Sequence, residues 1–348
     1  MLRSLFLIFV VSFAFLSKTF AAPLQSPSTA ILNVENENQR RQLSKKKNTT
    51  IPQEEVPEIV PGEAEDTGEL VIFKRRPLHN FFEVSVDSQL YYTSNMLLEE
   101  GNRGRKPIDT EVLVSTAQFA IAPDAYDLFG GQFSPRVGFR YQWYNYSLHS
   151  NRPMKAGFGL NNFDFDAETV FAEGRYRFGD NWIITAGFDW LRLLSHEPPT
   201  NNYAEFYKEY VPRIQVEKIF QLTDAQFLSI AYQGNFHFTQ TDPPDTTAND
   251  RTDHNITVSY TAEILPQLYF QPFGRVQFTH FTSQDDPADG NLRNDLLYST
   301  GLTLQYAFNN WSSIRTFFNY DHRESDSTII ADYDKWDSGV GVSLVFRF

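Results

Sequence analysis

The 348-residue chain contains no cysteine, so it can enter an oxidising compartment without a disulfide framework. Its one long apolar run, from Leu5 to Leu16, is too short to cross a bilayer as a helix. Basic residues are also few, since 30 Lys and Arg stand against 43 Asp and Glu, for a net charge of −13. Without a dense basic face to neutralise phosphates, nucleic-acid binding is not expected.

The N-terminus has the three parts of a secretory signal peptide. Arg3 supplies a positive charge, the run from Leu5 to Leu16 is apolar, and the small-residue stretch Thr19-Phe20-Ala21-Ala22 follows. Cleavage after Ala21 fits best, because a cut after Ala22 would place Pro23 directly behind the broken bond. We therefore expect residues 1–21 to be removed and the remainder to be exported without a helical anchor.

Residues 22–80 differ in composition from the rest of the chain. They hold a polar stretch, a basic cluster between Arg40 and Lys47, and a Pro/Glu-rich run from Pro52 to Glu69. Such low hydrophobicity cannot offset the entropy of the chain, so we predict a disordered periplasmic tail or linker. A tether or a plug of the domain that follows is the alternative role.

The remaining composition is an uncommon pairing of low hydropathy with many aromatics. The mean hydropathy is −0.41, yet the chain has 32 Phe and 17 Tyr. A soluble enzyme of this length would show more Leu and Ala and several segments of helical period. A membrane β-barrel needs an apolar residue only at every second position, so this composition favours a barrel.

From Phe81 onward the period of the sequence is two. Twelve candidate strands cover about 81–96, 110–122, 133–148, 163–178, 181–195, 205–220, 226–240, 252–264, 269–283, 294–308, 312–324 and 334–348. Tight connections alternate with long polar ones: the tight ones are Gly179-Asp180-Asn181, Thr223-Asp224-Ala225, Pro266-Gln267 and Asn309-Asn310, and the long ones include 241–251, 284–293 and 325–333. One segment expected to be tight, Pro123 to Gln132, is rather long.

This alternation of loop lengths is typical of bacterial outer-membrane barrels, whereas a soluble sandwich has no reason to produce it. It gives an even number of strands and puts both ends of the barrel on the periplasmic side. We therefore predict that residues 81–348 form an all-β, closed, antiparallel transmembrane barrel of about twelve strands in the outer membrane. Pairing of Phe82–Tyr92 with Val340–Phe348 closes it.

The terminal strand shows the alternation most sharply. Val340, Val342, Leu344, Phe346 and Phe348 share one face, and mostly polar or small residues occupy the other. This ending resembles the C-terminal signature that bacterial barrels present to their outer-membrane assembly machinery. The resemblance implies that the machinery is a partner of this chain, as is outer-membrane lipid.

A second, looser resemblance lies just before that strand. The segment Tyr320-Asp321-His322-Arg323-Glu324-Ser325-Asp326, followed by Tyr333, is similar to the end of porins of the beta-barrel porin 2 type. Such porins are often linked to exopolysaccharide export. The segment departs from the usual Ser-Asn after the arginine, covers only the C-terminal end of the chain, and carries no catalytic motif.

Aromatic residues gather near both ends of the predicted strands. Those beside the short turns are Phe178, Trp182, Phe308, Trp311 and Phe348, and those near the opposite end are Tyr92, Trp143, Trp190 and Trp336. Two belts of amphipathic rings are what the two membrane interfaces favour. A soluble core would not sort aromatics to strand ends.

Following the alternation, eight arginines are expected to line the lumen, mostly in its periplasmic half: Arg136, Arg140, Arg175, Arg177, Arg213, Arg275, Arg315 and Arg347. Glu173, Glu217 and Glu263 share that half, while Glu168, Asp189, Asp321 and Asp337 lie further out. A basic collar would attract anionic solutes such as an acidic polysaccharide. Alternatively, Arg and Glu pair across the lumen and fill it, because twelve strands lie between filled eight-stranded barrels and open sixteen-stranded channels.

Signals for chemistry are weak. Ser147 and His149 lie two residues apart but have no evident third member, and His237 is a lumen residue that the sequence leaves without company. The acidic run Asp285–Asn291 lacks the spacing of a calcium loop and reads as solvated loop charge. With no Walker loop, glycine fingerprint or zinc-type cluster, we expect no catalytic residue, no metal site and no cofactor.

These features predict a narrow pore or export conduit for anionic solutes or acidic polysaccharide. Two alternatives remain open. One is a structural or adhesive surface barrel with a closed lumen, and the other is a lipid-modifying outer-membrane enzyme.

Replacing Phe346 and Phe348 together with Ser should leave the protein in the periplasm as degraded or aggregated material. The terminal strand would then lose the signature for insertion, and the sheet would lose the strand that closes its edge. Immunoblots of separated outer-membrane and periplasmic fractions measure this. A normal outer-membrane yield of the double variant would contradict the assignment.

Overall fold

The computed structural model describes residues 81–96, 98, 107–146, 148, 163–197, 202–241, 249–285, 292–327, 330 and 332–348. Three features identified in the sequence lie outside these residues: the signal peptide with the tail (1–80), the Ser147/His149 pair, and the acidic run after Asp285. Among the residues described, no helix combines the length and the apolarity needed to span a membrane.

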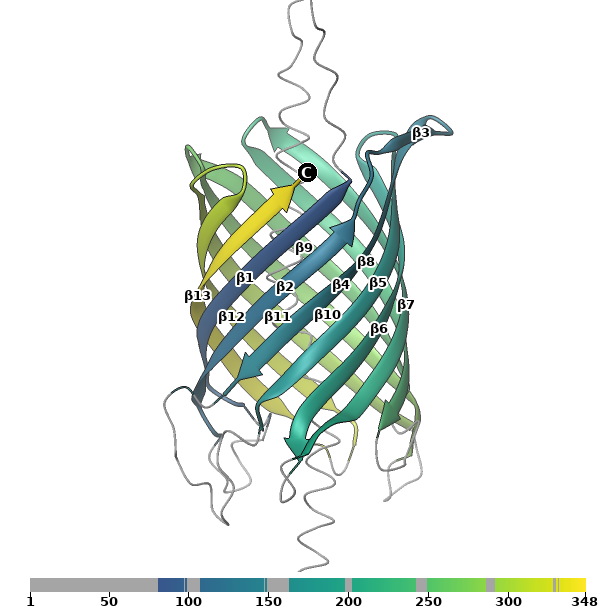
Figure 1. Ribbon diagram of the computed structural model, residues 1–348, viewed down its shortest axis with the longest axis vertical. Helices are drawn as coiled ribbons and strands as arrows, with labels where there is room; N and C mark the ends of the chain where they lie inside the picture. The colour runs from purple at the N-terminus through teal and green to yellow at the C-terminus, as the bar shows by residue number, and fades with distance from the viewer. Residues whose placement is uncertain are drawn as a thin grey trace, which may run out of the picture. The chain divides into compact units, whose positions relative to one another are not determined.

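The described residues form a single antiparallel sheet. Its strands are β1 (Phe82–Thr93), β2 (Thr110–Ile121), β3 (Tyr126–Leu128), β4 (Gly131–Asn145), β5 (Phe165–Phe178), β6 (Trp182–Glu197), β7 (Asn202–Thr223), β8 (Gln226–Thr241), β9 (Arg251–Leu265), β10 (Leu268–Asp285), β11 (Leu292–Ala307), β12 (Ser312–Ser325) and β13 (Tyr333–Arg347). Each long strand pairs with its neighbours in the chain, β2 pairs with β4, and β1 pairs with β13. The twelve long strands therefore close into a barrel (Figure 1), as the sequence predicts.

The seam between β1 and β13 is paired along its whole length. The register runs from Glu83 opposite Arg347 to Thr93 opposite Asp337 without a shift. At its end the backbone N–H of Phe82 donates to the carbonyl of Phe348 at 2.9 Å, and the N–H of Phe348 donates back at 3.0 Å. The predicted pairing of the first and last strands is confirmed, and it leaves no unpaired edge among the long strands.

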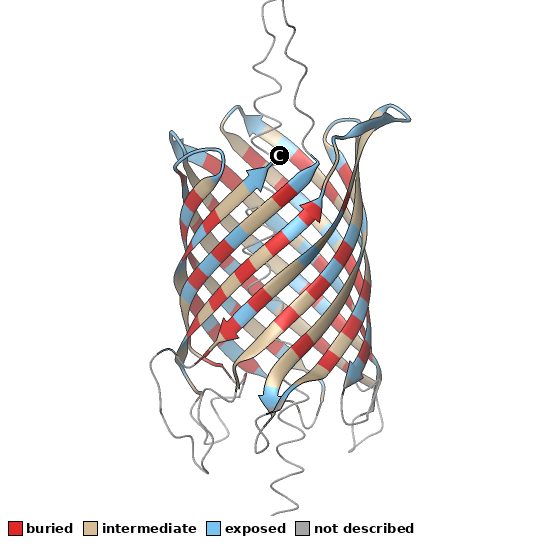
Figure 2. Ribbon diagram, viewed as in Figure 1, coloured by how far each residue is buried: buried red, intermediate tan, exposed pale blue. Residues whose placement is uncertain are grey.

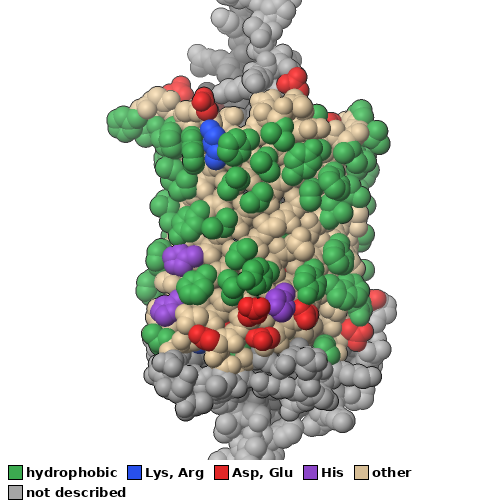
Figure 3. Space-filling view, turned by 180° about the vertical axis from the view of Figure 1, so that it is seen from behind, with side chains coloured by type: hydrophobic (Ala, Val, Ile, Leu, Met, Phe, Trp, Pro, Cys, Tyr) green, Lys and Arg blue, Asp and Glu red, His purple; other side chains and the backbone are tan. Residues whose placement is uncertain are grey.

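The two faces of the sheet differ as a strict period of two requires. On β13, Val340 and Val342 are 52% and 47% exposed, whereas Asp337 and Ser343 are 3% exposed. The same alternation produces the chequered burial of Figure 2, and hydrophobic side chains cover much of the outer surface in Figure 3. An apolar exterior around a polar interior is the inverse of a soluble protein and suits a barrel surrounded by lipid.

Aromatic residues lie on the outer face toward both ends of the barrel. Trp182, Trp311, Phe308 and Phe348 are exposed at the end of the short turns, and Trp143 and Trp336 are exposed toward the long loops. We call these ends the turn end and the loop end. Trp336 contacts Tyr92, and Trp311 stacks on Phe346 with ring centroids 5.6 Å apart. Such rings mark the two levels at which a bilayer meets water.

The segment 123–132, rather long for a turn, contains a short strand that the sequence analysis missed. Tyr126–Leu128 form β3, which pairs with the start of β4 in a hairpin. The chain reverses at Phe129 and Gly130, whose φ angles are +45° and +78°. Three residues are too few to establish a period of two, which is why the pattern does not reveal them.

Gly339 lies where the seam is tightest. A Cβ atom at this position would come within 2.4 Å of the carbonyl oxygen of Leu90 and of the Cβ of Tyr91, both on β1. The backbone of β1 cannot move away without weakening the closing ladder.

Gly339→Ala should therefore destabilise the folded barrel by about 1–3 kcal/mol, the usual cost of overpacking. The measurement is the urea midpoint of unfolding, followed by the heat-modifiable shift of the folded band on a gel. Gly274→Ala is the control, because a Cβ there meets no atom within 4 Å. Equal midpoints for the two variants would contradict the tight seam.

Candidate functional site in the barrel lumen

Contacts between non-adjacent strands identify the inward face. Glu83 on β1 bonds Arg136 on β4 although β2 lies between them, and Asp87 on β1 bonds Arg315 on β12 across β13. Side chains that meet over an intervening strand must project from the concave side of the sheet. These rows therefore face the lumen.

A chain of ion pairs runs along the wall of the turn-end half. Arg347 donates to Glu83 at 2.8 Å, and Glu83 also accepts from Arg136. Arg136 continues to Glu173 at 3.3 Å, and Glu173 accepts from Arg213 at 2.6 Å. Alternating charges thus link strands β13, β1, β4, β5 and β7.

Arg315 forms a second pair at the seam. Its Nη1 and Nη2 donate to the two carboxylate oxygens of Asp87 at 2.6 and 2.8 Å, and the hydroxyl of Ser343 joins the same carboxylate. Both charged side chains are nearly buried, with 2% and 11% of their surfaces exposed. This two-point contact holds β1 to β12 across the intervening strand β13.

The other predicted arginines lie on the same inward rows. Arg140 donates to Gln118 at 2.9 Å, and Arg275 donates to Ser299 at 3.0 Å. Arg175 and Arg177 follow Glu173 at alternate positions of β5, and Arg177 is opposite Gln132 of β4. The guanidinium groups of Arg136 and Arg140 both lie within 6 Å of the Phe171 ring. We call the eight arginines named in the sequence analysis the arginine collar.

Two of the predicted lumen acids have local partners. Glu217 is buried and accepts a hydrogen bond of 2.5 Å from Ser229 on the adjacent strand β8. Glu263 lies at the exposed end of β9, where it accepts from the backbone N–H of Gln267 in the β9–β10 turn at 2.8 Å. Glu263 therefore caps a turn at the rim of the barrel.

More acids meet the collar than the sequence predicts. Glu83 and Asp87 were not assigned to the lumen, yet they bind three of the eight arginines. Asp189, placed higher in the lumen, also reaches Arg213 at 3.5 Å. The tilt of the strands brings residues of different strands to one level, and alternation along a single strand cannot reveal that.

Glu168 was wrongly placed in the lumen. It lies five residues before Glu173 on the same strand, so their side chains are on opposite faces. Glu168 accepts a bond of 2.5 Å from Arg192 on the outer face near the loop end. Arg192 also lies over the Trp190 ring.

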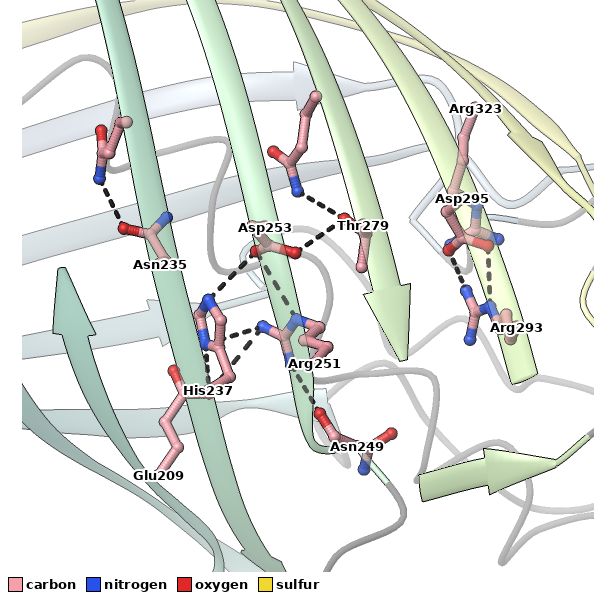
Figure 4. Close-up of polar contacts among 12 residues, drawn as sticks. Glu209, Asn235, His237, Asn249, Arg251, Asp253, Thr279, Arg293, Asp295 and Arg323 are labelled. Atoms are coloured by element: carbon pink, nitrogen blue, oxygen red, sulfur yellow. Dashed lines mark hydrogen bonds and ion pairs between the residues drawn. The ribbon is translucent and has the colours of Figure 1, made fainter. Parts of the chain in front are cut away.

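The loop-end half of the lumen holds a network that the sequence did not reveal (Figure 4). His237 on β8 lies between Glu209, 3.0 Å from its Nδ1, and Asp253, 3.1 Å from its Nε2. Arg251 approaches both carboxylates at 3.9 and 3.7 Å, and Thr279 donates to Asp253 at 2.7 Å. The expectation that His237 lacks partner residues is therefore wrong.

Further pairs continue around the same level. Arg293 bonds both oxygens of Asp295, and Arg323 approaches Asp295 at 4.0 Å (Figure 4). Lys335 lies between Asp321 and Asp337, at 3.5 and 3.0 Å. Within the described residues, no group of three His, Cys, Asp or Glu side chains is placed to hold a metal ion.

The two halves of the lumen differ in charge balance. In the turn-end half, the collar faces Glu83, Asp87, Glu173, Asp189 and Glu217, with Glu263 at the rim. In the loop-end half, the described cations Arg251, Arg293, Arg323 and Lys335 face Glu209, Asp253, Asp295, Asp321 and Asp337. Among the residues that the structure describes, arginines outnumber carboxylates in the turn-end half and not in the loop-end half.

Asp87→Asn should destabilise the barrel by about 3–5 kcal/mol, because Arg315 would keep a buried charge without its carboxylate. The urea midpoint of the heat-modifiable band measures the loss.

Glu168→Gln is the matched control, since it removes one carboxylate from a pair on the outer face whose arginine is 35% exposed. It should cost less than about 1 kcal/mol. Equal losses in the two variants would show that the Asp87–Arg315 contact does not hold the seam.

Comparison with known proteins finds no matching family model and no matching curated relative. Solved structures with a similar fold include an outer-membrane channel from Pseudomonas putida F1, at 12% identity and a TM-score of 0.47, covering 80% of this chain and 100% of that one. The β domain of the Bordetella autotransporter BrkA has 11% identity and a TM-score of 0.43, covering 77% and 100%. The KdgM porin has 11% identity and a TM-score of 0.37, covering 75% and 99%. By its own closure and its apolar exterior, the chain is a membrane-spanning β-barrel with the architecture of outer-membrane barrel proteins.

Proposed function

We propose that this chain is an outer-membrane pore with a narrow lumen that prefers anionic solutes. The observation that carries the proposal is the excess of arginine over carboxylate in the turn-end half of the lumen. Low-dielectric walls concentrate the field of such a collar and raise the local concentration of anions. Acidic sugars are a substrate class that suits it, because their carboxylates can form two-point contacts with guanidinium groups.

The orientation follows from the loops. We assign the turn end to the periplasm and the loop end to the cell exterior, as the loop lengths of outer-membrane barrels require. Residues 22–80 would then form a periplasmic tail after removal of the signal peptide, because β1 begins at the turn end. Insertion would proceed through the barrel-assembly machinery, which would read Val340, Val342, Leu344, Phe346 and Phe348.

Aromatic rings also lie on the inward face. Tyr144 stacks on Phe165 with ring centroids 4.4 Å apart, and Tyr91 on β1 contacts Phe317 on β12 with centroids 6.1 Å apart. Tyr144 and Phe317 are only 3% and 8% exposed, so these rings pack against the wall. The proposed preference for acidic sugars therefore rests on the arginines.

The extent of pairing favours a second candidate, a structural barrel with a closed lumen. At the loop end nearly every described charge has a partner of opposite sign, so those side chains are held by one another. Such a network adds rigidity without requiring transport. Conductance separates the two candidates.

The test is the reversal potential of the purified barrel in a planar bilayer under a potassium chloride gradient. Chloride should permeate better than potassium, and Arg175→Ala with Arg177→Ala should reduce that preference. The preference should weaken at 1 M salt, where the screening length falls to about 3 Å. Arg315 is avoided here, because its loss would leave Asp87 unpaired at the seam.

Arg192→Ala with Lys208→Ala is the control, since it removes the same charge from the outer face near the loop end. It should leave the selectivity unchanged. A cation-selective wild-type pore would defeat the proposal, and a folded barrel that gives no current would establish the closed barrel in its place.

A further inference from the structure

The β3–β4 hairpin presents an apolar tip at the turn end. Phe129 at the point of reversal is 93% exposed, and Tyr126 and Leu128 on β3 are 55% and 42% exposed. Figure 1 shows β3 standing out from the barrel wall beyond the neighbouring turns. Two other turns at this end carry acidic tips, at Asp180 and Asp224. An exposed apolar patch of this kind marks a surface that meets something other than water.

The hairpin continues the lipid-facing surface of the barrel. Tyr126 is opposite Phe133, and Leu128 is opposite Gly131, so both lie on the same face as the outward residues of β4. That outward row goes on along β4 with Val137 and Phe139, which are 52% and 41% exposed. One apolar strip therefore runs from the middle of the barrel to the tip of the hairpin.

Specific contacts hold the hairpin against this strip. The hydroxyl of Tyr176, on the outer face of β5, donates to the carbonyls of Leu128 and Phe129 at 3.0 and 3.2 Å. The absence of a side chain at Gly131 allows this approach, because a Cβ there would come within 2.7 Å of the Tyr176 ring. The hydrogen bonds from Tyr176 on β5 therefore fix the direction in which the hairpin projects.

Residues next to the hairpin indicate the depth at which this end of the barrel lies in the membrane. Tyr176 stacks on Phe178, which is opposite Trp182 on β6. The ammonium group of Lys218 lies 5.2 Å from the centre of the Trp182 ring and bonds the carbonyl of Asp180. An outward Trp beside an outward Lys is typical of the headgroup region, where each keeps a polar group in water.

We propose that the β3–β4 hairpin is a lipid anchor, which inserts Leu128 and Phe129 into the interfacial region of the leaflet at the turn end. The occupant of its apolar face is phospholipid, because that face is continuous with the lipid-facing strip of β4. The anchor fixes the depth and tilt of the barrel at one side. It depends on the barrel spanning the membrane and not on whether the lumen conducts.

Because the chain has no cysteine, one introduced thiol can report on the tip alone. The full chain carrying Phe129→Cys, spin-labelled and reconstituted in phosphatidylethanolamine/phosphatidylglycerol bilayers, is examined by electron paramagnetic resonance. Collisions with oxygen, which concentrates in lipid, should exceed those with a water-soluble nickel chelate. Asp224→Cys at the tip of the β7–β8 turn is the matched control, and its label should collide several-fold more often with the chelate.

Adding Tyr176→Phe to Phe129→Cys should raise chelate access, because the two hydrogen bonds that direct the hairpin are lost. Chelate access at position 129 equal to that at position 224 would overturn the proposal, because the tip would then lie in water. A water-exposed label that becomes protected only when periplasmic extract is added would also overturn it, in favour of a protein partner.

Discussion

Closure of the sheet by the pairing of β1 with β13 is the constraint on which the rest of the molecule depends. In hydrocarbon there is no water to satisfy a free N–H or C=O, so a sheet can cross a bilayer only if its edges meet. The uninterrupted register between Glu83 and Thr93 meets this demand, and the hydrogen bonds between Phe82 and Phe348 complete it. The C-terminal residue is consequently a structural member of the seam.

Closure also creates the site. Glu83, at the start of the barrel, lies beside Arg347, at its end, and both belong to the chain of charges that continues through Arg136 to Glu173 and Arg213. The Glu83–Arg347 and Asp87–Arg315 contacts cross the seam between β1 and β13, so an open sheet would lack them, whereas Arg136 and Glu173 lie on the adjacent strands β4 and β5. The charge of the collar and the stability of the seam are therefore coupled, and Arg315 with Asp87 serves both.

Much of the fold was predictable, because period-two alternation and loop lengths are local properties of the sequence. The faces of β13 and the pairing that closes the barrel follow from them directly. The site was predictable only in part. All eight arginines lie on inward rows, but Glu83 and Asp87 were missed, because contacts across intervening strands depend on strand tilt. Glu168 was placed on the wrong face against the alternation of β5 itself, since it lies an odd number of positions before Glu173. The partners of His237 lie on the adjacent strands β7 and β9, so they depend on the register between strands, which alternation along one strand does not give. Strand β3 is too short to produce a pattern.

Solute flux is the direct measure of whether the lumen is open and favours anions. Proteoliposomes carrying the purified barrel are loaded with glucose and glucuronate, which differ by one carboxylate. Potassium and valinomycin are present to remove any membrane potential. If the lumen is an open path lined by the arginine collar, glucuronate leaves faster than glucose, and both leave faster than from protein-free vesicles. Faster efflux of glucose, or efflux no faster than from empty vesicles, would contradict such a lumen.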